Sequence, residues 1–411
     1  MSKELTMEKT SLPAGWELKK LIELGEVQTG TTPSTSNKGF YGSFIPFVKP
    51  PHFNPNGTIS FSSSGLSEIG LLKGRFVREN SILMVCIGAS IGKTGITPIP
   101  VSCNQQINAF SPNESCFPKF YYYLLSSDYF FKKVMKRSSQ ATLPMINKKN
   151  WQNIEIPFPP LTQQKQIVAI LDKAFAAIDT AKANAKQNLQ NAKELFESYL
   201  QNVFENKGND WEEKRIKDLT ELVTKGSSPK WQGVNYIDEG GIFFLTSKNV
   251  GEGELLLNNK KYLEEKFNDI QKTSILKKGD VLTNIVGASI GRTAIFNLDE
   301  ITNINQAVCL MRCNSEKVYN YYLLYLLNSP FFKNILHDNE VDNARANLSL
   351  TFFKNLAIPL PKLLEQKEIV KNIKSFSTET KKLEAIYTQK IADLEELKKS
   401  VLQKAFSGQL T

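Results

Sequence analysis

Histidine is nearly absent from this chain of 411 residues, which has only His52 and His337, and its five cysteines show no paired spacing. So few ligands cannot assemble a zinc site from cysteine and histidine. They also leave no recognisable Ser/His/Asp or Cys/His set for nucleophilic catalysis. An odd number of scattered thiols is typical of a reducing compartment. The sequence therefore predicts neither a disulfide scaffold nor a metal site.

The chain also lacks a long apolar run. The longest one, around residues 82–87, is far shorter than the about 20 residues that cross a bilayer. Residues 1–10 are polar and charged, which is not typical of a signal peptide, so we expect a cytoplasmic protein. Positive charge is in excess: the net charge is +10 and the isoelectric point is about 9.1, which favours a polyanionic partner.

The sequence consists of two similar copies of one unit. Residues 88–94 (GASIGKT) return as residues 287–293 (GASIGRT), about 200 residues later. The pattern PxPxLxxQKxIV of residues 157–168 returns in residues 359–370. A period this long is too great for a solenoid or propeller repeat, and each copy is large enough to bury its own core. The chain is therefore a tandem duplication that presents two similar surfaces.

Each copy has two unlike parts. In the first part, short apolar runs such as residues 44–48, 81–87 and 280–286 alternate with turn residues, which predicts mainly β structure. Glycine and proline are then missing from residues 161–207 and 362–407, which predicts two long helices. We expect an α+β protein with segments 1–156 (first globular domain), 157–206 (first helix), 207–358 (second globular domain) and 359–411 (second helix).

Apolar residues recur in both helices with the 3.5-residue period of a coiled coil. Two long amphipathic helices in one chain bury their stripes most simply against each other, and the alternative is that each packs on its own globular domain. We therefore predict that the two helices form a coiled coil, in a chain with an internal pseudo-twofold repeat. The residues predicted to form the coiled coil or to dock other subunits are Gln164, Leu171, Phe175, Ile178, Leu189, Phe196, Gln366, Ile373, Leu383, Leu394 and Leu397.

Two segments come close to known catalytic motifs. Residues 88–94 resemble a phosphate-binding loop, but three residues, not four, separate the first glycine from the Gly-Lys pair, and no helix is expected to follow. Residues 49–52 (KPPH) resemble the base-binding motif of amino-methyltransferases, but lysine stands where that motif needs a polar acceptor. The sequence favours a glycine turn between two strands over a nucleotide site.

Polar loop residues offer a chemistry for DNA. Asparagine and glutamine can bind adenine edges, and arginine or lysine can bind guanine, while a basic residue at the tip of a turn suits phosphate contact. Asn104 and Asn305, which follow strand-like runs, are expected to be structural. Residues 34–61 and 230–257 differ between the copies, as sequence-reading segments would. The candidate DNA-binding residues are Lys49, His52, Lys93, Thr94, Gln105, Gln106, Arg137, Gln140, Lys230, Lys248, Arg292, Thr293, Gln306, Arg345 and Asn347.

The chain resembles the specificity (S) subunit of type I restriction-modification enzymes. The resemblance is carried by the two proline-glutamine helix starts (Gln164, Gln366), the two glycine turns and the ending AFSGQL of residues 405–410, in this order and duplicated. It implies two mainly-β target-recognition domains joined by an antiparallel coiled coil of the two helices. Each domain would bind one part of a bipartite site in double-stranded DNA, with an unread spacer between the parts. It also implies that two methyltransferase subunits dock on the helices and that the complex recruits restriction (translocase-nuclease) subunits.

The resemblance further implies that this chain binds no cofactor, and that S-adenosylmethionine, ATP and Mg²⁺ act in the partner subunits. Other functions stay open at this point. A specificity subunit of a methylation-only system would have the same sequence features. A degenerate P-loop NTPase, a self-contained methyltransferase and a coiled-coil adaptor that binds only protein are the competing classes.

Overall fold

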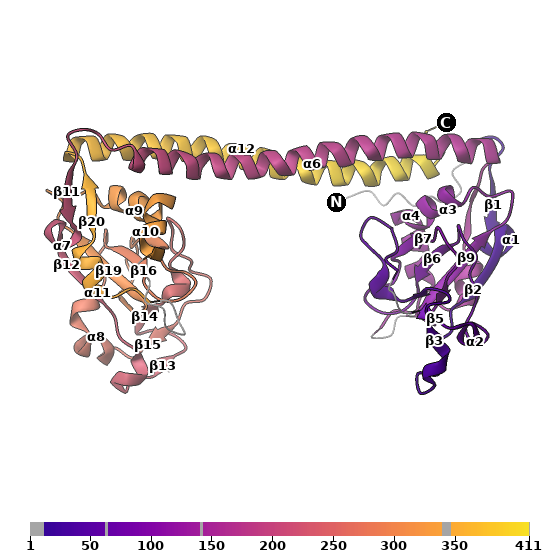
Figure 1. The fold of residues 1–411 in the computed structure, drawn as a ribbon, viewed down its shortest axis with the longest axis horizontal. Helices are drawn as coiled ribbons and strands as arrows, with labels where there is room; N and C mark the ends of the chain where they lie inside the picture. Colours follow the sequence, from indigo (N-terminus) through magenta and orange to yellow (C-terminus); the bar gives the residue numbers. More distant parts are fainter. Residues whose placement is uncertain (1–11, 62–64, 140–142, 339–346, 411) are drawn as a thin grey trace. The chain divides into compact units, whose positions relative to one another are not determined.

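The computed structural model describes residues 12–61, 65–139, 143–338 and 347–410. The chain divides into two compact units. The first comprises the residues up to Ala185 together with those from Gln389 onward, and the second comprises Lys186–Thr388. Each unit therefore holds one globular domain and a part of each of the two long helices (Figure 1).

In its described residues, the first globular domain has ten strands and several short helices. The strands are β1 (Glu17–Lys20), β2 (Gly25–Thr29), β3 (Tyr41–Gly42), β4 (Phe47–Val48), β5 (Gly65–Leu66), β6 (Ile82–Val85), β7 (Thr94–Ile96), β8 (Ser102–Cys103), β9 (Ile107–Pro112) and β10 (Glu155–Phe158). The helices are α1 (Leu21–Leu24), η1 (Lys38–Phe40), η2 (Pro50–His52), α2 (Glu68–Leu71), α3 (Pro118–Leu125), α4 (Asp128–Arg137) and α5 (Lys148–Gln152).

The second globular domain repeats this order. Its strands are β11 (Glu212–Arg215), β12 (Thr220–Lys225), β13 (Tyr236–Ile237), β14 (Ile242–Leu245), β15 (Tyr262–Leu263), β16 (Val281–Asn284), β17 (Thr293–Ile295), β18 (Thr302–Ile304), β19 (Val308–Cys313) and β20 (Ala357–Leu360). Its helices are α7 (Ile216–Leu219), η3 (Pro229–Gln232), η4 (Ser247–Asn249), α8 (Lys266–Ile270), η5 (Lys272–Ser274), α9 (Asn320–Asn328), α10 (Pro330–Asp338) and α11 (Leu350–Asn355).

The main sheet has the same topology in both domains. The strands beside it form two two-stranded sheets, β3-β5 and β4-β8, in the first domain and one four-stranded sheet, β13-β15-β14-β18, in the second. An antiparallel sheet has the order β2-β9-β6-β7 in the first domain and β12-β19-β16-β17 in the second. Beside it, β4 pairs with β8 in parallel, as β14 does with β18. The outer pairs β1-β10 and β11-β20 are also equivalent. The repeat seen in the sequence is therefore a repeat of the whole fold, as predicted.

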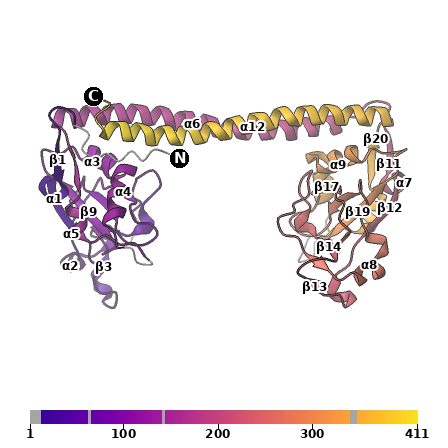
Figure 2. The ribbon, with the colours of Figure 1, turned by 180° about the vertical axis from the view of Figure 1, so that it is seen from behind.

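The aromatic stretches 120–133 and 319–336 each span two helices. Ser127 and Ser329 lie at the breaks between α3 and α4 and between α9 and α10, and both hydroxyls accept a backbone N–H of the following helix. These helices lie on the side of each sheet that faces the long helices (Figures 1 and 2). In the first unit, Phe120 of α3 packs edge-on against Phe406.

The long helices are α6 (Leu161–Glu205) and α12 (Leu363–Phe406), as the missing glycine and proline predicted. In the first unit, Lys182 pairs with Glu395 at 2.5 Å and Asp179 with Lys398 at 3.1 Å, so the helices run antiparallel. In the second unit, the Tyr199 and Phe376 rings stack with centroids 4.3 Å apart. The predicted antiparallel coiled coil is confirmed.

The predicted coiled-coil seam is right for α6 and displaced in part of α12. Leu171, Phe175 and Ile178 are buried, and Leu189 and Phe196 are half-buried. In α12, Ile373 is buried and Leu394 half-buried, but Leu383 and Leu397 are 38% and 47% exposed. Half-buried Glu384 and Lys398, each one residue later, take the seam positions that were predicted for these two leucines.

The expected alternative, packing on the globular domains, is also present at the helix ends. Ile167, Val168, Leu171 and Phe406 belong to the core of the first domain. Leu200, Phe204, Val370 and Ile373 belong to the core of the second. Each domain therefore continues its core into the helix pair, which fixes the domain on its part of the coiled coil.

Gln164 and Gln366 are neither in the coiled-coil seam nor available for docking, because both are fully buried. The side-chain amide of Gln164 donates to the carbonyls of Pro159 and Ser115, and its oxygen accepts the Phe117 N–H at 2.7 Å. Gln366 makes the same three bonds, to Pro361, Lys317 and Tyr319. Each glutamine thus ties the start of a long helix to the segment before α3 or α9.

Candidate nucleic-acid interface

Four loops meet at one end of the main sheet of the first domain. Strands β2 and β6 both run antiparallel to β9, so they end where β9 begins. The Gly30 N–H donates to the Ile107 carbonyl and the Cys86 N–H to the Gln106 carbonyl. The Asn104 N–H donates to the carbonyl of Val48 at the end of β4. We call the segments 30–32, 49–52, 86–93 and 104–106 the first recognition edge.

The second domain builds an equivalent edge. The Asn305 N–H donates to the Leu245 carbonyl at the end of β14, and the Ile285 N–H donates to the Ala307 carbonyl. The amide of Asn284 donates to the Ser247 carbonyl at 2.8 Å. We call the segments 226–228, 246–249, 285–292 and 305–307 the second recognition edge.

Both edges have a one-sided charge. Their segments contain Lys49, Lys93, Lys248 and Arg292, and they contain no aspartate or glutamate. All four basic side chains are exposed. A surface that combines cations with amides and hydroxyls, and that lacks carboxylates, attracts phosphates and offers hydrogen bonds to bases.

The glycine-rich segments are turns between strands. Residues 86–93 join β6 to the antiparallel β7, and residues 285–292 join β16 to β17. Gly88 and Gly287 have φ of 82° and 79°, a backbone conformation that favours glycine. No helix opens at either turn, so the arrangement that cradles nucleotide phosphates is missing from both.

Two residues of these turns were wrongly predicted to contact DNA. Thr94 is buried, and its hydroxyl donates to the carbonyls of Gly92 and Leu125. Thr293 is fully buried, and its hydroxyl donates to the Gly291 carbonyl. As the first residues of β7 and β17 they point into the domain, whereas their neighbours Lys93 and Arg292 point to solvent.

The amide-rich turns separate into structural and exposed residues. Asn104 and Asn305 accept the N–H two residues onward, which stabilises each turn, as expected. Gln106 is half-buried, and its side-chain oxygen accepts from Asn104 at 2.9 Å. Gln105 is exposed, and its side-chain oxygen accepts a hydrogen bond from the Thr32 hydroxyl. Gln306 is half-buried.

Lys49 and His52 belong to a short turn that both domains share. His52 Nδ1 accepts the Lys49 N–H at 3.3 Å, and Asn249 Oδ1 accepts the Thr246 N–H at 3.0 Å in the second domain. Burial and the nearby Lys49 charge lower the pKa of His52. A neutral imidazole suits this role, because only an unprotonated Nδ1 can accept the hydrogen bond. Thr246, not the sequence-matched Lys248, is therefore the structural counterpart of Lys49.

The remaining candidates lie in several places. Arg137 ends α4, and its guanidinium donates to the Asn153 carbonyl at 2.5 Å, so it serves packing and not the edge. Lys230 is exposed in η3. Asn347 is exposed and forms a β-bridge with Val286 of the second edge. Gln140 and Arg345 lie outside the described residues.

Sequence reasoning did not name two polar residues that lie beside the edges, Arg75 and Gln232, although Gln232 falls within the segment 230–257 that was expected to read sequence. The Arg75 Nε–H donates to the Thr31 hydroxyl at 3.4 Å. In the second domain, the Gln232 amide donates to the Ser227 hydroxyl at 3.1 Å. Neither Arg75 nor Gln232 recurs at a matching place in the other copy, and Arg75 lies outside both of the segments that were expected to read sequence.

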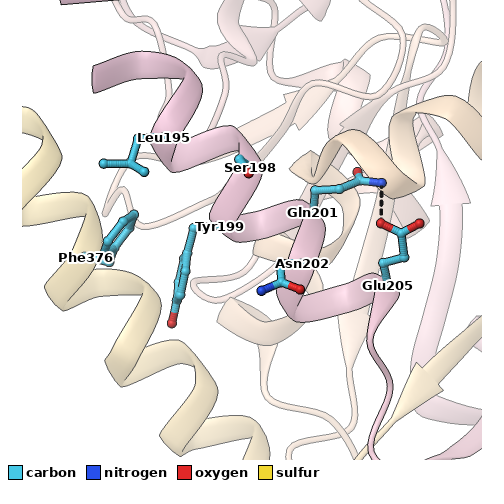
Figure 3. Close-up of a pocket in the computed structure, with 7 residues that line it drawn as sticks. All are labelled: Leu195, Ser198, Tyr199, Gln201, Asn202, Glu205 and Phe376. Carbon is cyan, nitrogen blue, oxygen red and sulfur yellow. Dashed lines mark hydrogen bonds between the residues drawn. The ribbon is translucent and has the colours of Figure 1, made fainter. Parts of the chain in front are cut away.

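The helix pair has a separate exposed surface. In the second unit, Leu195, Ser198, Tyr199, Gln201, Asn202, Glu205 and Phe376 line a shallow hollow of about 370 Å³ (Figure 3). Leu195 is 48% exposed at its rim, and the Gln201 amide donates to Glu205 at 3.0 Å. Leu397, the repeat equivalent of Leu195, is exposed in the first unit.

Within the described ranges, no group of three or more His, Cys, Asp or Glu side chains could hold a metal ion. Cys86, Cys103, Cys309 and Cys313 are free thiols whose pKa burial raises to between about 11 and about 12. Such thiols are poor nucleophiles. Among the helices of the described residues, none is long and apolar enough to cross a membrane.

Comparison with known proteins places both repeats in one family. The family model described as "type I restriction modification DNA specificity domain" matches residues 13–191 and again 208–395. The MjaVIII type I restriction enzyme specificity subunit of Methanocaldococcus jannaschii is 24% identical over 97% of this chain and 94% of its own length.

Two solved structures share the fold. A chain from a study of complex assembly and conformational transition of the type I R-M system has a TM-score of 0.76 at 20% identity, covering 97% of this chain and 100% of the other. The HsdS subunit from Thermoanaerobacter tengcongensis has a TM-score of 0.63 at 21% identity, covering 98% and 100%.

Proposed function

Because the chain belongs to the family of type I restriction-modification DNA specificity proteins, we propose that each of its globular domains binds one part of a bipartite DNA site through its recognition edge. The observation that carries this proposal is the repeated edge itself, where four loops bring exposed cations and amides together without a carboxylate. The two edges share their scaffold and differ in their side chains, so they would recognise different sequences.

We further propose that the chain is not itself a catalyst and binds no cofactor. The segments that come nearest to catalytic motifs are a strand-to-strand turn at Gly88 and a short turn at Lys49. On this proposal the chemistry belongs to partner subunits, in which S-adenosylmethionine, ATP and Mg²⁺ would act. Purified chain should then neither methylate DNA nor hydrolyse ATP. Turnover that Lys93→Ala abolishes would overturn this part.

The partners we propose are two methyltransferase subunits that dock on the helix pair, with restriction subunits joining through them. Leu195 and Leu397 occupy repeat-equivalent positions on α6 and α12, and both are exposed although they are apolar. An exposed leucine gains free energy when a partner covers it. One leucine in each unit matches one partner for each unit.

The docking proposal predicts additive effects. Leu195→Asp and Leu397→Asp should each lower the number of bound methyltransferase subunits by one, and the double variant should bind none. Native mass spectrometry of the reconstituted complex measures this stoichiometry. Gln187→Asp, at an exposed position of α6 outside the hollow, is a control for added charge. Full binding by the double variant would contradict the assignment.

The DNA proposal is tested by selection of bound sequences from a random pool, with the complete complex. We expect a motif with two defined parts and an undefined gap of constant length. Affinity should fall steeply with salt, because phosphate contacts release counterions. A single continuous motif, or no enriched sequence, would overturn the proposal. Binding that does not depend on salt would favour a protein-only adaptor.

A further inference from the structure

Arg75 lies beside the first recognition edge on a backbone that is held in place. Its own N–H donates to the Ser102 hydroxyl at 3.3 Å, and Val77 forms two backbone hydrogen bonds with Val101. Ser102 and Val101 lead directly into the turn at Asn104 and Gln105. The position of Arg75 is therefore coupled to the edge through β8 and does not depend on a free loop.

The guanidinium of Arg75 is oriented by a hydrogen bond, but most of its donors are not engaged. Only its Nε–H is engaged, by the Thr31 hydroxyl, and its two terminal NH₂ groups have no partner among the described residues. Other arginines are used differently. Arg78 and Arg137 donate from terminal nitrogens to the carbonyls of Pro112 and Asn153. Arg312 pairs with the carboxylate of Asp280. Arg75 thus presents an oriented fork of donors to solvent.

The exposed amide of Gln105 lies next to this fork. Thr31 contacts Arg75, and the adjacent Thr32 donates its hydroxyl to the Gln105 side-chain oxygen. One short segment, Thr31 and Thr32, therefore contacts two exposed side chains whose donors and acceptors can bind base edges.

The second domain uses a different side chain at the same place. Gly30 and Gly226 are equivalent, because a Cβ on either would collide with the carbonyl before the amide-rich turn, at Cys103 or Ile304. Thr31 therefore corresponds to Ser227, whose hydroxyl contacts Gln232. The position matching Arg75, by the equivalent bonds of Val77 and Leu276, is the fully buried Ser274.

We propose that the hydroxyl after this glycine orients one base-reading side chain in each domain: Arg75 in the first, which reads a guanine, and Gln232 in the second, which reads an adenine. An arginine fork matches the O6 and N7 acceptors of guanine, and a glutamine amide matches the N6 donor and N7 acceptor of adenine in the major groove. The inference rests on the proposed DNA-binding function and adds which residue reads which base in each domain.

The test is selection from a random DNA pool with the complete complex, comparing the wild type with Arg75→Lys. Lysine keeps the charge but loses the bidentate fork. We expect one position in one part of the motif to lose its guanine preference by about 10-fold to 100-fold, since a bidentate pair is worth about 1–3 kcal/mol and each 1.4 kcal/mol is a factor of ten. The other part of the motif should not change.

Two further variants sharpen the test. Gln232→Met should remove one adenine preference from the other part of the motif and leave the Arg75 part intact. Lys73→Ala removes a cation from the same loop as Arg75, and it should lower affinity alike for all sequences. In each variant the undisturbed half of the motif serves as an internal measure of folding.

The outcomes separate this inference from the proposed function. If the wild type enriches no motif, the proposed function fails. If the wild type enriches a bipartite motif that Arg75→Lys leaves unchanged, or changes in both parts, only this inference is overturned. Loss of binding to every sequence by a folded Arg75→Lys protein would also overturn it, because a base-reading contact changes preference at one position.

Discussion

One pair of equivalent positions allows the duplication to be used as its own control. In the second domain, Arg312 Nε and Nη2 donate to the two carboxylate oxygens of Asp280 at 2.9 and 2.8 Å. The side chains are 18% and 2% exposed. In the first domain, the equivalent residues are Ser111 and Ser81, whose hydroxyls lie 2.7 Å apart. The same point of the fold is thus held by an ion pair in one copy and by two hydroxyls in the other.

Arg312→Ser alone should destabilise the second domain strongly. Among the described residues, Asp280 would keep only the Lys277 N–H, at 2.7 Å, as a donor. Breaking a buried ion pair by removing one partner costs about 3–5 kcal/mol. The double variant Asp280→Ser with Arg312→Ser copies the first domain and leaves no buried charge. Its cost should be smaller, about 1–2 kcal/mol, mainly from the volume of the lost side chain.

Hydrogen exchange measured by mass spectrometry can follow the two domains separately in the intact chain. Peptides from β16 and β19 should exchange roughly two to four orders of magnitude faster in Arg312→Ser, since each 1.4 kcal/mol is a factor of ten. Peptides from β6 and β9 report the unaltered domain and should keep their rates. If the single variant exchanges no faster than the double one, the pair is not electrostatically coupled as described and the reasoning is refuted.

Three further predictions concern the edges and the helices. Lys93→Ala and Arg292→Ala should each weaken DNA binding by the same factor for all sequences and reduce the slope of log affinity against log salt by about one. A change of preference at one base would contradict the assignment of these residues to phosphate contact. His52→Asn, which copies Asn249 of the second domain, should abolish a loss of stability that the wild type shows below about pH 6.5. The pKa of folded His52 is lowered, so the unfolded chain takes up the proton first as the pH falls. Urea unfolding midpoints at pH 5.5 and 7.5 measure this, and equal pH dependence in both proteins would count against it. Seven residues can be removed from each long helix, 184–190 and 387–393, which face each other if the register of the Lys182–Glu395 pair continues. This deletion shortens each helix by ~10 Å and should shorten the unread gap by about three base pairs at ~3.4 Å per pair. Methylation of the original site at the original rate would show that helix length does not set the gap.

The architecture could be predicted from the sequence because the patterns that indicate it extend over many residues. Forty or more residues without glycine or proline can hardly be anything but helix, and a repeated order of motifs leaves few alternatives to a repeated fold. The phase of the α12 seam could not be predicted in the same way. At 383/384 and 397/398 a leucine stands beside a charged residue, and a 3.5-residue period accepts either position of each pair. The ends of α12 set the phase of its seam, because Ile373 and Phe406 are buried in the cores of the domains.

The site was harder to predict because the residues that build its scaffold recur in both copies, whereas residues that read bases need not recur. Residues shared by the two copies, such as Thr94 and Thr293 or Asn104 and Asn305, were the easiest to find, and they hold the turns together. A side chain that reads a particular base has no reason to recur in a domain that reads another. Arg75 and Gln232 come from different segments and reach equivalent hydroxyls only after folding.

A duplicated recognition protein can therefore change its target without disturbing its fold, provided that the contacts that define the edge stay on the backbone. The loops of both edges are tied by equivalent backbone hydrogen bonds, from Cys86 and Ile285 and from Asn104 and Asn305. Those bonds do not depend on which side chains the loops carry, so Arg75, Gln105 and Gln232 are free to vary around them. The free energy that holds the edge and the free energy that selects a base are thus supplied by different atoms, and a substitution that alters the second need not reduce the first.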